Sequence, residues 1–402
     1  MKTIDRRGRG RGTLSPPVVT PRFPYNEIEM MNRMIVSNLV HRPLRSVISI
    51  VAIAIEVTLI LLIVGLSIGI MNDSKKRTAG IGADVMVQPP GASFISSFGG
   101  APVSIKVADV LRTLDHVEAA VPVVMWTNTN GSIEVIYGID LKPGSPNNFD
   151  NTGHPFRYLA GGPFQGPDDI MVDDYFAGQK NVHVGDKLTM LNHDFRISGI
   201  VENGKGARKF VQMATLQDLI GANNKASMFY LRLDNPDNAD SVVNEIKQHP
   251  GLENYNVRSL KEYLSMMTVQ NYPGFSSFIK VVIGISMIIG FIVIFQSMYT
   301  AVMERTREIG ILKSLGADKA YIVRLILRET VTLAICGILL GIGISYIAKL
   351  GINAKFPLMT VQMTGTWIGY ASLIAIVGAV IGAIYPAFKA AQKDPIDALA
   401  YE

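Results

Sequence analysis

The densest group of side chains suited to specific chemistry lies in residues 304–317, which read ERTREIGILKSLGA. Its charged, apolar and glycine members are Glu304, Arg305, Arg307, Glu308, Ile309, Gly310, Leu312, Lys313, Leu315 and Gly316. The apolar residues recur mostly every third position between polar faces, which predicts a short amphipathic helix. Arg305 and Glu308 can form an i,i+3 ion pair, and Gly316 suits the left-handed position that ends a helix. The expected chemistry is docking, either to a membrane surface or to another protein.

Other chemical patterns do not favour catalysis. The six histidines are scattered without the spacing of metal ligands, which indicates surface or structural roles. Residues 199–206, GIVENGKG, are one residue short of a phosphate-binding loop. They also place Gly206 where the magnesium-binding Ser or Thr would stand, and no helical pattern follows. We therefore expect a strand and a turn there, with no catalytic, cofactor or metal residues and no ATPase in this sequence.

The elements that must position the charged block are membrane spans. Of the 402 residues, 48% are hydrophobic and 18% are charged, whereas about a quarter are charged in an average soluble protein. About 20 apolar residues in a helix cross a bilayer. Four segments meet this requirement, namely residues 47–71, 278–302, 320–347 and 366–385. The third begins with Arg324, Arg328 and Glu329, which we expect in the interface or the cytosol.

The basic residues of the short loops predict the orientation of these spans. They concentrate before the first span, in residues 303–319 after the second, and in the tail 386–402. We assign these three regions, and so both termini, to the cytosol, which leaves residues 72–277 and the short loop 348–365 outside. Residues 1–25 are rich in Arg, Gly and Pro and predict a disordered basic tail near anionic lipid, without nucleic-acid binding.

The region outside the membrane predicts a mixed domain. Runs of β-branched and aromatic residues alternate with short helical patterns. The expected strands are 84–88, 132–137, 187–190, 195–200 and 228–233, and the expected helices are 107–114, 215–220 and 239–248. The fold class is therefore membrane α-helical with four spans, plus an α+β extracytoplasmic domain inserted between the first two. Gly, Pro and Asn crowd residues 138–166, which predicts two lobes divided there.

One carboxyl group lies deep in the predicted membrane. Glu56 stands about ten residues into the first span, roughly 15 Å deep, where an unpaired charge is costly. It could line a substrate groove or act as a proton-linked switch. Alternatively, it is a protonated side chain hydrogen-bonded to Gln296, Tyr299 or Tyr346.

Two glycine pairs predict close helix packing. Gly337 and Gly341 in the third span, and Gly378 and Gly382 in the fourth, have the Gly-xxx-Gly spacing. Small residues at this spacing let helix backbones approach closely. The pairs either pack the third and fourth spans together or join two subunits, and the spacing does not choose between them.

Several segments resemble one family. Residues 304–317 resemble the signature of MacB/FtsX-type ABC transporter permeases, and residues 385–402 resemble the family's closing motif, with Phe388 where a basic residue is more usual. The order of residues 169–174, 184–188 and 195–201 is similar to the MacB periplasmic core domain. The resemblance covers nearly the whole chain after about residue 30.

The resemblance implies a permease of the type VII class in the bacterial inner membrane. It implies a dimer, expected to contain two identical permeases, that works with two separate ATPase subunits holding ATP and Mg²⁺. Residues 303–319 would be the cytosolic coupling helix and turn that meets the ATPase, and residues 26–46 would form an amphipathic helix on membrane lipids. ATP-driven closure would reach the outer domain as mechanical movement. A periplasmic adaptor or an outer-membrane protein is a further possible partner.

Three functional hypotheses follow. The leading one is a permease subunit that exports or extracts a hydrophobic or amphiphilic cargo, such as a lipid, lipoprotein, peptide or drug, from the periplasm or outer leaflet. The alternative is an FtsX-like relay that activates a periplasmic cell-wall hydrolase without transport. The size of residues 72–277 favours transport. The third, a membrane-anchored binding protein, leaves the enclosed charged helix unexplained.

Overall fold

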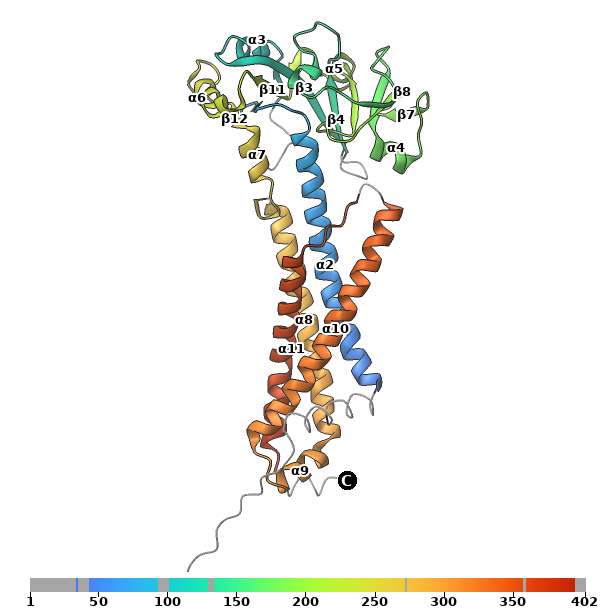
Figure 1. Cartoon of the computed structure of the whole chain (residues 1–402), viewed down its shortest axis with the longest axis vertical. Helices are drawn as coiled ribbons and strands as arrows, with labels where there is room; N and C mark the ends of the chain where they lie inside the picture. Colours follow the sequence, from blue (N-terminus) through green and yellow to red (C-terminus); the bar gives the residue numbers. More distant parts are fainter. Residues whose placement is uncertain are drawn as a thin grey trace, which may run out of the picture.

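The computed structural model describes Met34 and residues 43–92, 101–128, 134–271, 273–356 and 359–394. A bundle of long helices carries a sheet domain at one end, and the short helix α9 lies at the opposite end of the bundle, which we call the far end (Figure 1). The predicted tail 1–25, residues 26–42 apart from Met34, and residues 395–402 lie outside the described residues.

Four described helices are long and apolar enough to cross a membrane, which confirms the four predicted spans. They are α2 (Pro43–Ala79), α8 (Pro273–Glu304), α10 (Lys319–Lys355) and α11 (Gly365–Gln392). At 1.5 Å per residue, the 37 residues of α2 extend about 55 Å, well beyond a hydrocarbon core of about 30 Å. α2 therefore leaves the predicted membrane and enters the sheet domain as the same helix (Figure 1).

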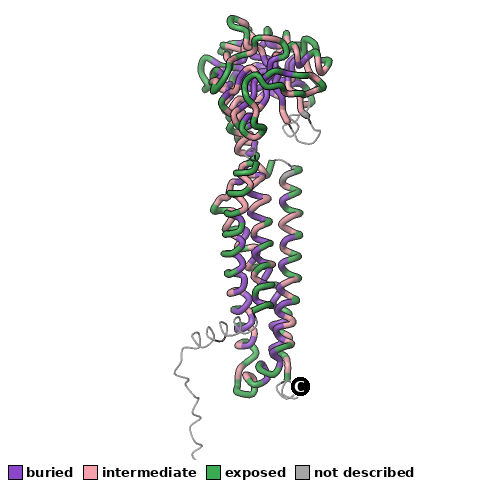
Figure 2. The backbone as a smooth tube through the Cα atoms, turned by 90° about the vertical axis from the view of Figure 1, so that its right-hand side faces the viewer, coloured by how far each residue is buried: buried purple, intermediate pink, exposed green. Residues whose placement is uncertain are grey.

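Close approaches at glycine hold the bundle together. A Cβ atom at Gly341 of α10 would lie 2.7 Å from the carbonyl oxygen of Ala54 in α2, and one at Gly382 of α11 would lie 3.0 Å from that of Phe291 in α8. Gly337 likewise contacts Ile53 of α2, and Gly378 lies beside Met287 of α8. Both pairs thus pack within one chain, the first against α2 and the second against α8 rather than against each other, and a role in joining two subunits stays a prediction. Buried, intermediate and exposed residues alternate along the helices of the bundle (Figure 2).

The sheet domain has one continuous mixed sheet of ten strands. Its order is β12 (Asn256–Ser259), β1 (Val85–Gln88), β11 (Met228–Leu233), β3 (Val117–Asn128), β4 (Glu134–Ile139), β9 (Lys209–Gln212), β6 (Asp169–Asp173), β8 (His193–Val201) and β5 (Tyr158–Gly161), with β7 (Lys187–Met190) on β8. β2 (Val103–Ser104) and β10 (Lys225–Ala226) form a separate pair. The β4–β9 and β6–β8 pairs are parallel and the other pairs are antiparallel.

Short helices pack around the sheet. They are α3 (Val107–Leu111), η1 (Phe149–Thr152), α4 (Asp174–Lys180), α5 (Met213–Ile220), η2 (Pro236–Asn238), α6 (Ala239–Gln248), α7 (Leu260–Met266) and η3 (Val269–Asn271). One apolar cluster includes α3 and α6, and another includes α4 and α5. They meet within β3, between Ala120 and Val124. The predicted division at 138–166 is therefore wrong.

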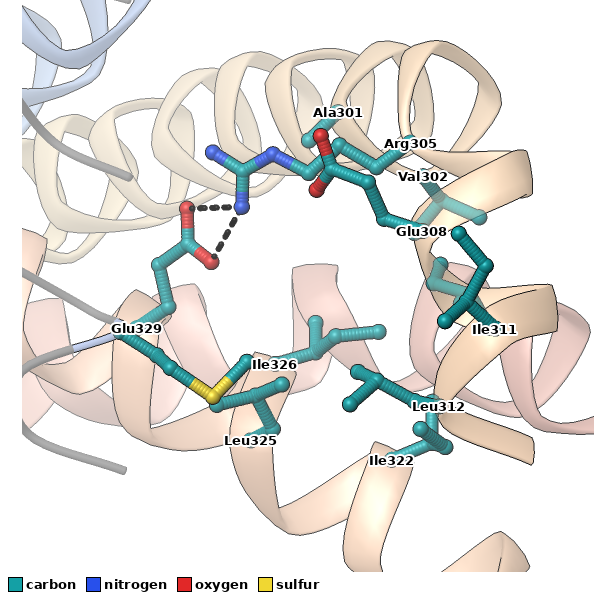
Figure 3. A pocket seen from close by; sticks show the side chains of 12 residues that line it. Ala301, Val302, Arg305, Glu308, Ile311, Leu312, Ile322, Leu325, Ile326 and Glu329 are labelled. Atoms are coloured by element: carbon teal, nitrogen blue, oxygen red, sulfur yellow. Dashed lines mark hydrogen bonds and ion pairs between the residues drawn. The ribbon is translucent and has the colours of Figure 1, made fainter. Parts of the chain in front are cut away.

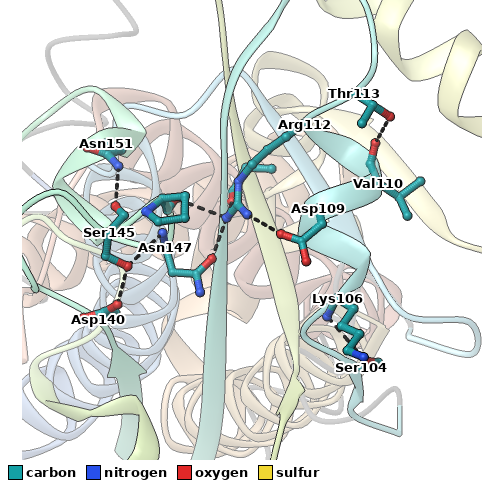
Figure 4. Close-up of polar contacts among 12 residues, drawn as sticks. Ser104, Lys106, Asp109, Val110, Arg112, Thr113, Asp140, Ser145, Asn147 and Asn151 are labelled. Carbon is teal, nitrogen blue, oxygen red and sulfur yellow. Dashed lines mark hydrogen bonds and ion pairs between the residues drawn. The ribbon is translucent and has the colours of Figure 1, made fainter.

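The segment that was expected to divide the domain is instead fastened across it. Arg112, just after α3, pairs with Asp109 at 2.8 Å and donates to the carbonyl oxygen of Pro146 at 3.1 Å and to the side chain of Asn147 (Figure 4). Ser145 donates to Asp140 at 2.7 Å within the same loop. Gly, Pro and Asn here build a tight, internally bonded turn rather than a linker, because short polar side chains satisfy the turn's backbone.

Alternate side chains of β11 pack on opposite faces of the sheet, and one of these faces meets the end of the bundle. Met228 and Tyr230 lie in a buried cluster that contains Met71 of α2, whereas Phe229 and Leu231 pack with the α6 side. Successive side chains of a strand point to opposite faces. The face towards the membrane is therefore as buried as the other, because the end of α2 covers it.

Candidate functional site

The charged block forms the helix α9 (Thr306–Ser314), as predicted. Its end satisfies its own backbone: the amide of Gly316 donates to the carbonyl of Lys313 and that of Ala317 to the carbonyl of Leu312, both at 3.0 Å. Gly316 has φ of 100°, so a glycine is favoured there. Asp318 then caps α10 by accepting from the amide of Tyr321 at 2.6 Å. A tight turn thus fixes α9 between α8 and α10.

The predicted site residues divide into two faces. The buried or half-buried members are Arg305, Ile309, Gly310, Leu312 and Lys313. The exposed members are Glu304, Arg307, Glu308, Leu315 and Gly316. Leu315 is 80% exposed and Ile311 is 44% exposed, so the outward face presents apolar as well as charged groups. The helix is held by one face, and the other face, which we call the docking face because docking is predicted there, is exposed.

A buried ion cluster anchors the start of α9. Arg305 lies 3.1 Å from Glu329 of α10, and Arg45 of α2 lies 3.0 Å from the same carboxylate. Glu329 is only 4% exposed, so its carboxylate lies inside the bundle between the two arginines, and its expected place in the interface or the cytosol stays a prediction. Arg305 pairs with Glu329 rather than with Glu308 because its side chain turns into the bundle (Figure 3). The helical spacing of Ile326, Glu329 and Leu333 could have placed Glu329 on the packed face of α10.

A second anchor holds the other end of α9. The ammonium group of Lys313 donates to the carbonyl oxygen of Ala391 at 3.0 Å and to that of Lys393. These carbonyls belong to the last turn of α11 and the residue after it, where no intrahelical donors remain. Lys313 therefore connects α9 to the fourth long helix, in the position where a cation also interacts favourably with the helix dipole.

Between these anchors, α9 borders a cavity of about 290 Å³. Figure 3 shows the Arg305–Glu329 pair at one side and apolar side chains of α8, α9 and α10 around the rest. Val302, Ile322 and Ile326 belong to this apolar wall, and Met34 also borders the cavity. The helix is thus attached firmly at its ends and packed less tightly at its middle.

At the opposite end of the bundle, the phosphate-loop lookalike receives a structural role. β8 ends at Val201, and Lys205 donates to the carbonyls of Gly80 at 2.9 Å and His154 at 2.6 Å. The amide of Gly206 donates to the carbonyl of Arg77 at 2.9 Å. The segment therefore closes the end of α2, as a strand and a turn. Lys205 is committed to backbone oxygens.

Glu56 is buried against α8, with 4% of its surface exposed. A Cβ atom at Gly290 would lie 2.1 Å from Glu56 Oε2, so this carboxyl occupies the space that Gly290 leaves. Glu56 Oε1 has no hydrogen-bond partner among the described residues. Gln296, Tyr299 and Tyr346 do not bond to it, and Tyr299 instead accepts from Lys389 at 3.3 Å. Those expected partners are wrong; the groove and switch interpretations stay predictions.

The sequence matches known families over both halves. Residues 46–249 match the MacB-like periplasmic core domain, and residues 280–395 match the FtsX-like permease C-terminal family. The chain belongs to the MacB/FtsX family of ABC transporter permeases. It is therefore a multi-pass membrane protein whose sheet domain lies outside the cytoplasm, and the 402 residues contain no ATPase domain.

Two curated relatives show how this MacB/FtsX permease compares in length. It is 25% identical over 400 residues to the uncharacterized ABC transporter permease YknZ of Bacillus subtilis, with 92% of this chain and 98% of that protein covered. It is also 25% identical over 411 residues to the macrolide export ATP-binding/permease protein MacB of Shewanella sp. strain W3-18-1. That alignment covers 93% of this chain but only 61% of the Shewanella protein.

Two solved structures align with parts of this chain. The periplasmic region of MacB from Actinobacillus actinomycetemcomitans aligns with 47% of this chain and 94% of its own, at 13% identity and a TM-score of 0.35. The extracellular domain of YknZ aligns with 44% of this chain and 99% of its own, at 14% identity and a TM-score of 0.33.

Proposed function

We propose that this permease couples ATP hydrolysis on a separate ATPase chain to movement of its sheet domain, and so exports or extracts a hydrophobic or amphiphilic cargo. The cargo class includes lipids, lipoproteins, peptides and drugs. ATP and Mg²⁺ belong to the ATPase. In this arrangement the far end of the bundle and both termini face the cytosol of a bacterium, and the sheet domain faces the periplasm or exterior.

The two-faced character of α9 carries the proposal. Arg305 and Ile309 are buried in the bundle, while Arg307, Glu308 and Leu315 face outward. A helix lying on lipid would instead turn its most apolar face outward. A rim of charge around exposed apolar side chains is typical of a protein interface. The docking face therefore supports an ATPase as the occupant.

The expected assembly contains two ATPase subunits and two copies of this permease. An additional periplasmic adaptor or outer-membrane protein would extend the path of an exported cargo. The Shewanella relative is named for macrolide export, which supports a drug among the candidate cargoes. Its name also states that ATP-binding and permease functions share one chain, whereas here the ATPase would act in trans.

Charge reversal on the exposed face tests the docking assignment. The variant Glu304→Lys/Glu308→Lys should lose association with the ABC ATPase of the same cell that is most similar to the ATP-binding half of MacB. Association and permease-stimulated hydrolysis are measured with both proteins in lipid nanodiscs. Arg324→Gln, on an exposed position of α10, is the matched control. Unchanged association and stimulation in the double variant would contradict the assignment.

The same preparation separates export from a relay function. The match of residues 46–249 to the MacB-like core domain favours transport. Co-purification of an adaptor or outer-membrane protein, together with ATP-dependent movement of a fluorescent lipid or drug in vesicles, would support it. A bound cell-wall hydrolase that is activated by ATP without any cargo movement would favour the FtsX-like relay instead.

A further inference from the structure

Two routes lead from α9 to the sheet domain. One is the chain itself, through α8; the other crosses Glu329 to α2. We propose that movement of α9 reaches the sheet domain mainly through α2, and that Glu329 is the positioning residue that transfers it. This inference rests on the proposed function, because it needs an ATPase to move α9.

The first step is the ion cluster at the far end. Glu329 Oε1 and Oε2 lie 3.4 and 3.1 Å from the same nitrogen of Arg305, and Oε1 lies 3.0 Å from Arg45. The side chains of Arg305, Glu329 and Arg45 are 10%, 5% and 13% exposed. A buried ion pair is costly to separate, because each charge is left without its partner. A displacement of Arg305 is therefore expected to carry Glu329 and Arg45 with it.

The second step is the length of α2 itself. The helix runs from Pro43 to Ala79 without an internal proline. Its middle is locked to α10 where Gly341 meets Ala54, and its outer part is crossed by residues 359–364. There the amide of Gln362 donates to the carbonyl of Gly65 at 2.9 Å. A Cβ atom at Gly69 would lie 1.5 Å from the Thr360 oxygen, so backbone rests on backbone. The supported helix can act as a rod.

The third step is the attachment of α2 to the sheet. Asp73 lies 2.8 Å from Arg208 and 3.3 Å from Arg77, and Arg208 lies 2.9 Å from Asp173 at the end of β6. Each of these four side chains is 17% exposed or less. Lys205 and Gly206 add hydrogen bonds to the last carbonyls of the helix. The end of α2 is therefore bonded to the half of the domain that contains β6 and β9.

The route through α8 passes through short segments. α8 is preceded by η3, which has three residues, and by α7, which follows β12. α7 is fastened to the sheet domain where the amide of Leu260 donates to the carbonyl of Asp84 at 2.7 Å. The side chain of Asn271 donates to the carbonyl of Met266 at 2.9 Å, within the same connection. We expect this interrupted connection to tether the domain but to transmit a push less directly than the continuous helix α2.

The decisive variant is Arg45→Gln, which removes the ion pair between Glu329 and α2 and keeps the Arg305–Glu329 pair that anchors α9. The readout is the ATP-induced change in distance between spin labels at Asp115→Cys in the sheet domain and Leu350→Cys in α10, both exposed positions. Because Cys336 is the single cysteine, Cys336→Ser supplies the background. The complex with the ATPase is measured in nanodiscs, with hydrolysis recorded in the same sample.

We expect Arg45→Gln to retain ATPase association and hydrolysis while the ATP-induced coupling to the sheet domain falls about 5-fold or more. A flexible Gly-Ser-Gly insertion after Asn271 should leave the ATP-induced change largely intact. The reverse pattern, with the insertion abolishing the change and Arg45→Gln preserving it, would overturn the proposal. If the unmutated permease does not associate with the ATPase, the proposed function itself is rejected.

Arg45→Lys is a second variant that keeps the proposal testable if Arg45→Gln misfolds. It keeps the positive charge beside Glu329 but replaces the planar guanidinium by a compact ammonium. We expect partial transmission in a stably folded protein. Full transmission by both substitutions would show that Arg45 does not position α2, and would also overturn the proposal.

Discussion

The two ends of α2 are both held by buried ions, but the clusters are built differently. At the far end, one carboxylate, Glu329, lies between Arg45 and Arg305. At the sheet domain, the carboxylates of Asp73 and Asp173 alternate with Arg77 and Arg208 in a chain of ion pairs, and hydrogen bonds to backbone carbonyls lie beside it. The first cluster is centred on one carboxylate that is shared by three segments. The second is balanced in charge and has several independent contacts, so it should tolerate the loss of one.

The largest effect is expected from Glu329→Ala, which breaks the far-end cluster. It removes the carboxylate that two buried guanidinium groups share, and removing one partner of a buried ion pair costs about 3–5 kcal/mol. Thermal unfolding of the full chain in detergent should show this loss. Asp73→Ala should cost less, because Arg208 keeps Asp173 as its partner. Equal losses at the two positions would remove the difference between the clusters.

The next effect concerns the backbone contact at the sheet-domain end. A Cβ atom at Gly80 would lie 2.0 Å from the carbonyl oxygen of Gly204, and neither backbone can yield as a flexible side chain would. Gly80→Ala should therefore destabilise the protein by about 1–3 kcal/mol. Gly178→Ala in α4 is the control, because nothing lies within 4 Å of its added Cβ. Similar unfolding temperatures for the two variants would contradict this close contact.

A pH effect should separate the two clusters further. Burial raises the pKa of Asp173 to about 6, although Arg208 and the amide of Phe176 favour the charged form. Its unfolded pKa is near 3.8, so the folded state binds more protons between these values. Stability attributable to this carboxyl should therefore rise by about 1 kcal/mol as the pH falls from 7 to 5.

That gain should disappear in Asp173→Asn. Fluorescence of Trp126 in a Trp367→Phe background would follow unfolding of the sheet domain in the full chain, since the sequence has two tryptophans. If the free energy of unfolding depends on pH in the same way in the unmutated protein and in Asp173→Asn, Asp173 binds protons equally well in the folded and unfolded states, which would contradict this prediction.

The smallest effect on stability is expected at the exposed face of α9. Leu315→Ser changes a side chain that is 80% exposed, so the free energy of unfolding should change by about 0.5 kcal/mol or less. ATPase binding should nevertheless weaken, because an apolar docking contact is lost. Unfolding and binding assays on the same preparation test both statements. Strong destabilisation without altered binding would place Leu315 in the fold rather than in the docking face.

Local patterns predicted α9 and its end correctly. The spacing of Ile309 and Leu312, followed by Gly316, encodes an amphipathic turn and its termination within fourteen residues. The four spans could also be predicted from the sequence, because the length and hydropathy of a segment depend only on its own residues. The phosphate-loop pattern could be rejected from the identity of Gly206, but the role of Lys205 at the end of α2 depends on residues far away in sequence.

Contacts between distant segments could not be obtained in this way. The pairing of Glu329 with Arg45, 284 positions earlier, could not be predicted from either local pattern. The partner of Glu56 was sought among polar groups, whereas the fold places Gly290 there and leaves space for the carboxyl. Likewise, Gly-xxx-Gly spacing reports that a helix can be approached closely but not by which neighbour.

The attachment of α2 to the sheet has a geometric consequence. β12, above α7 and α8, is an edge strand, whereas Asp173 at the end of β6 lies in the other half of the same sheet. α2 is joined to both halves, because it continues into β1 beside β12 and its end is bonded to Arg208 and, through it, to Asp173. A small sliding of α2 along α8 would therefore load the two halves together, and we expect the continuous sheet to move as one piece.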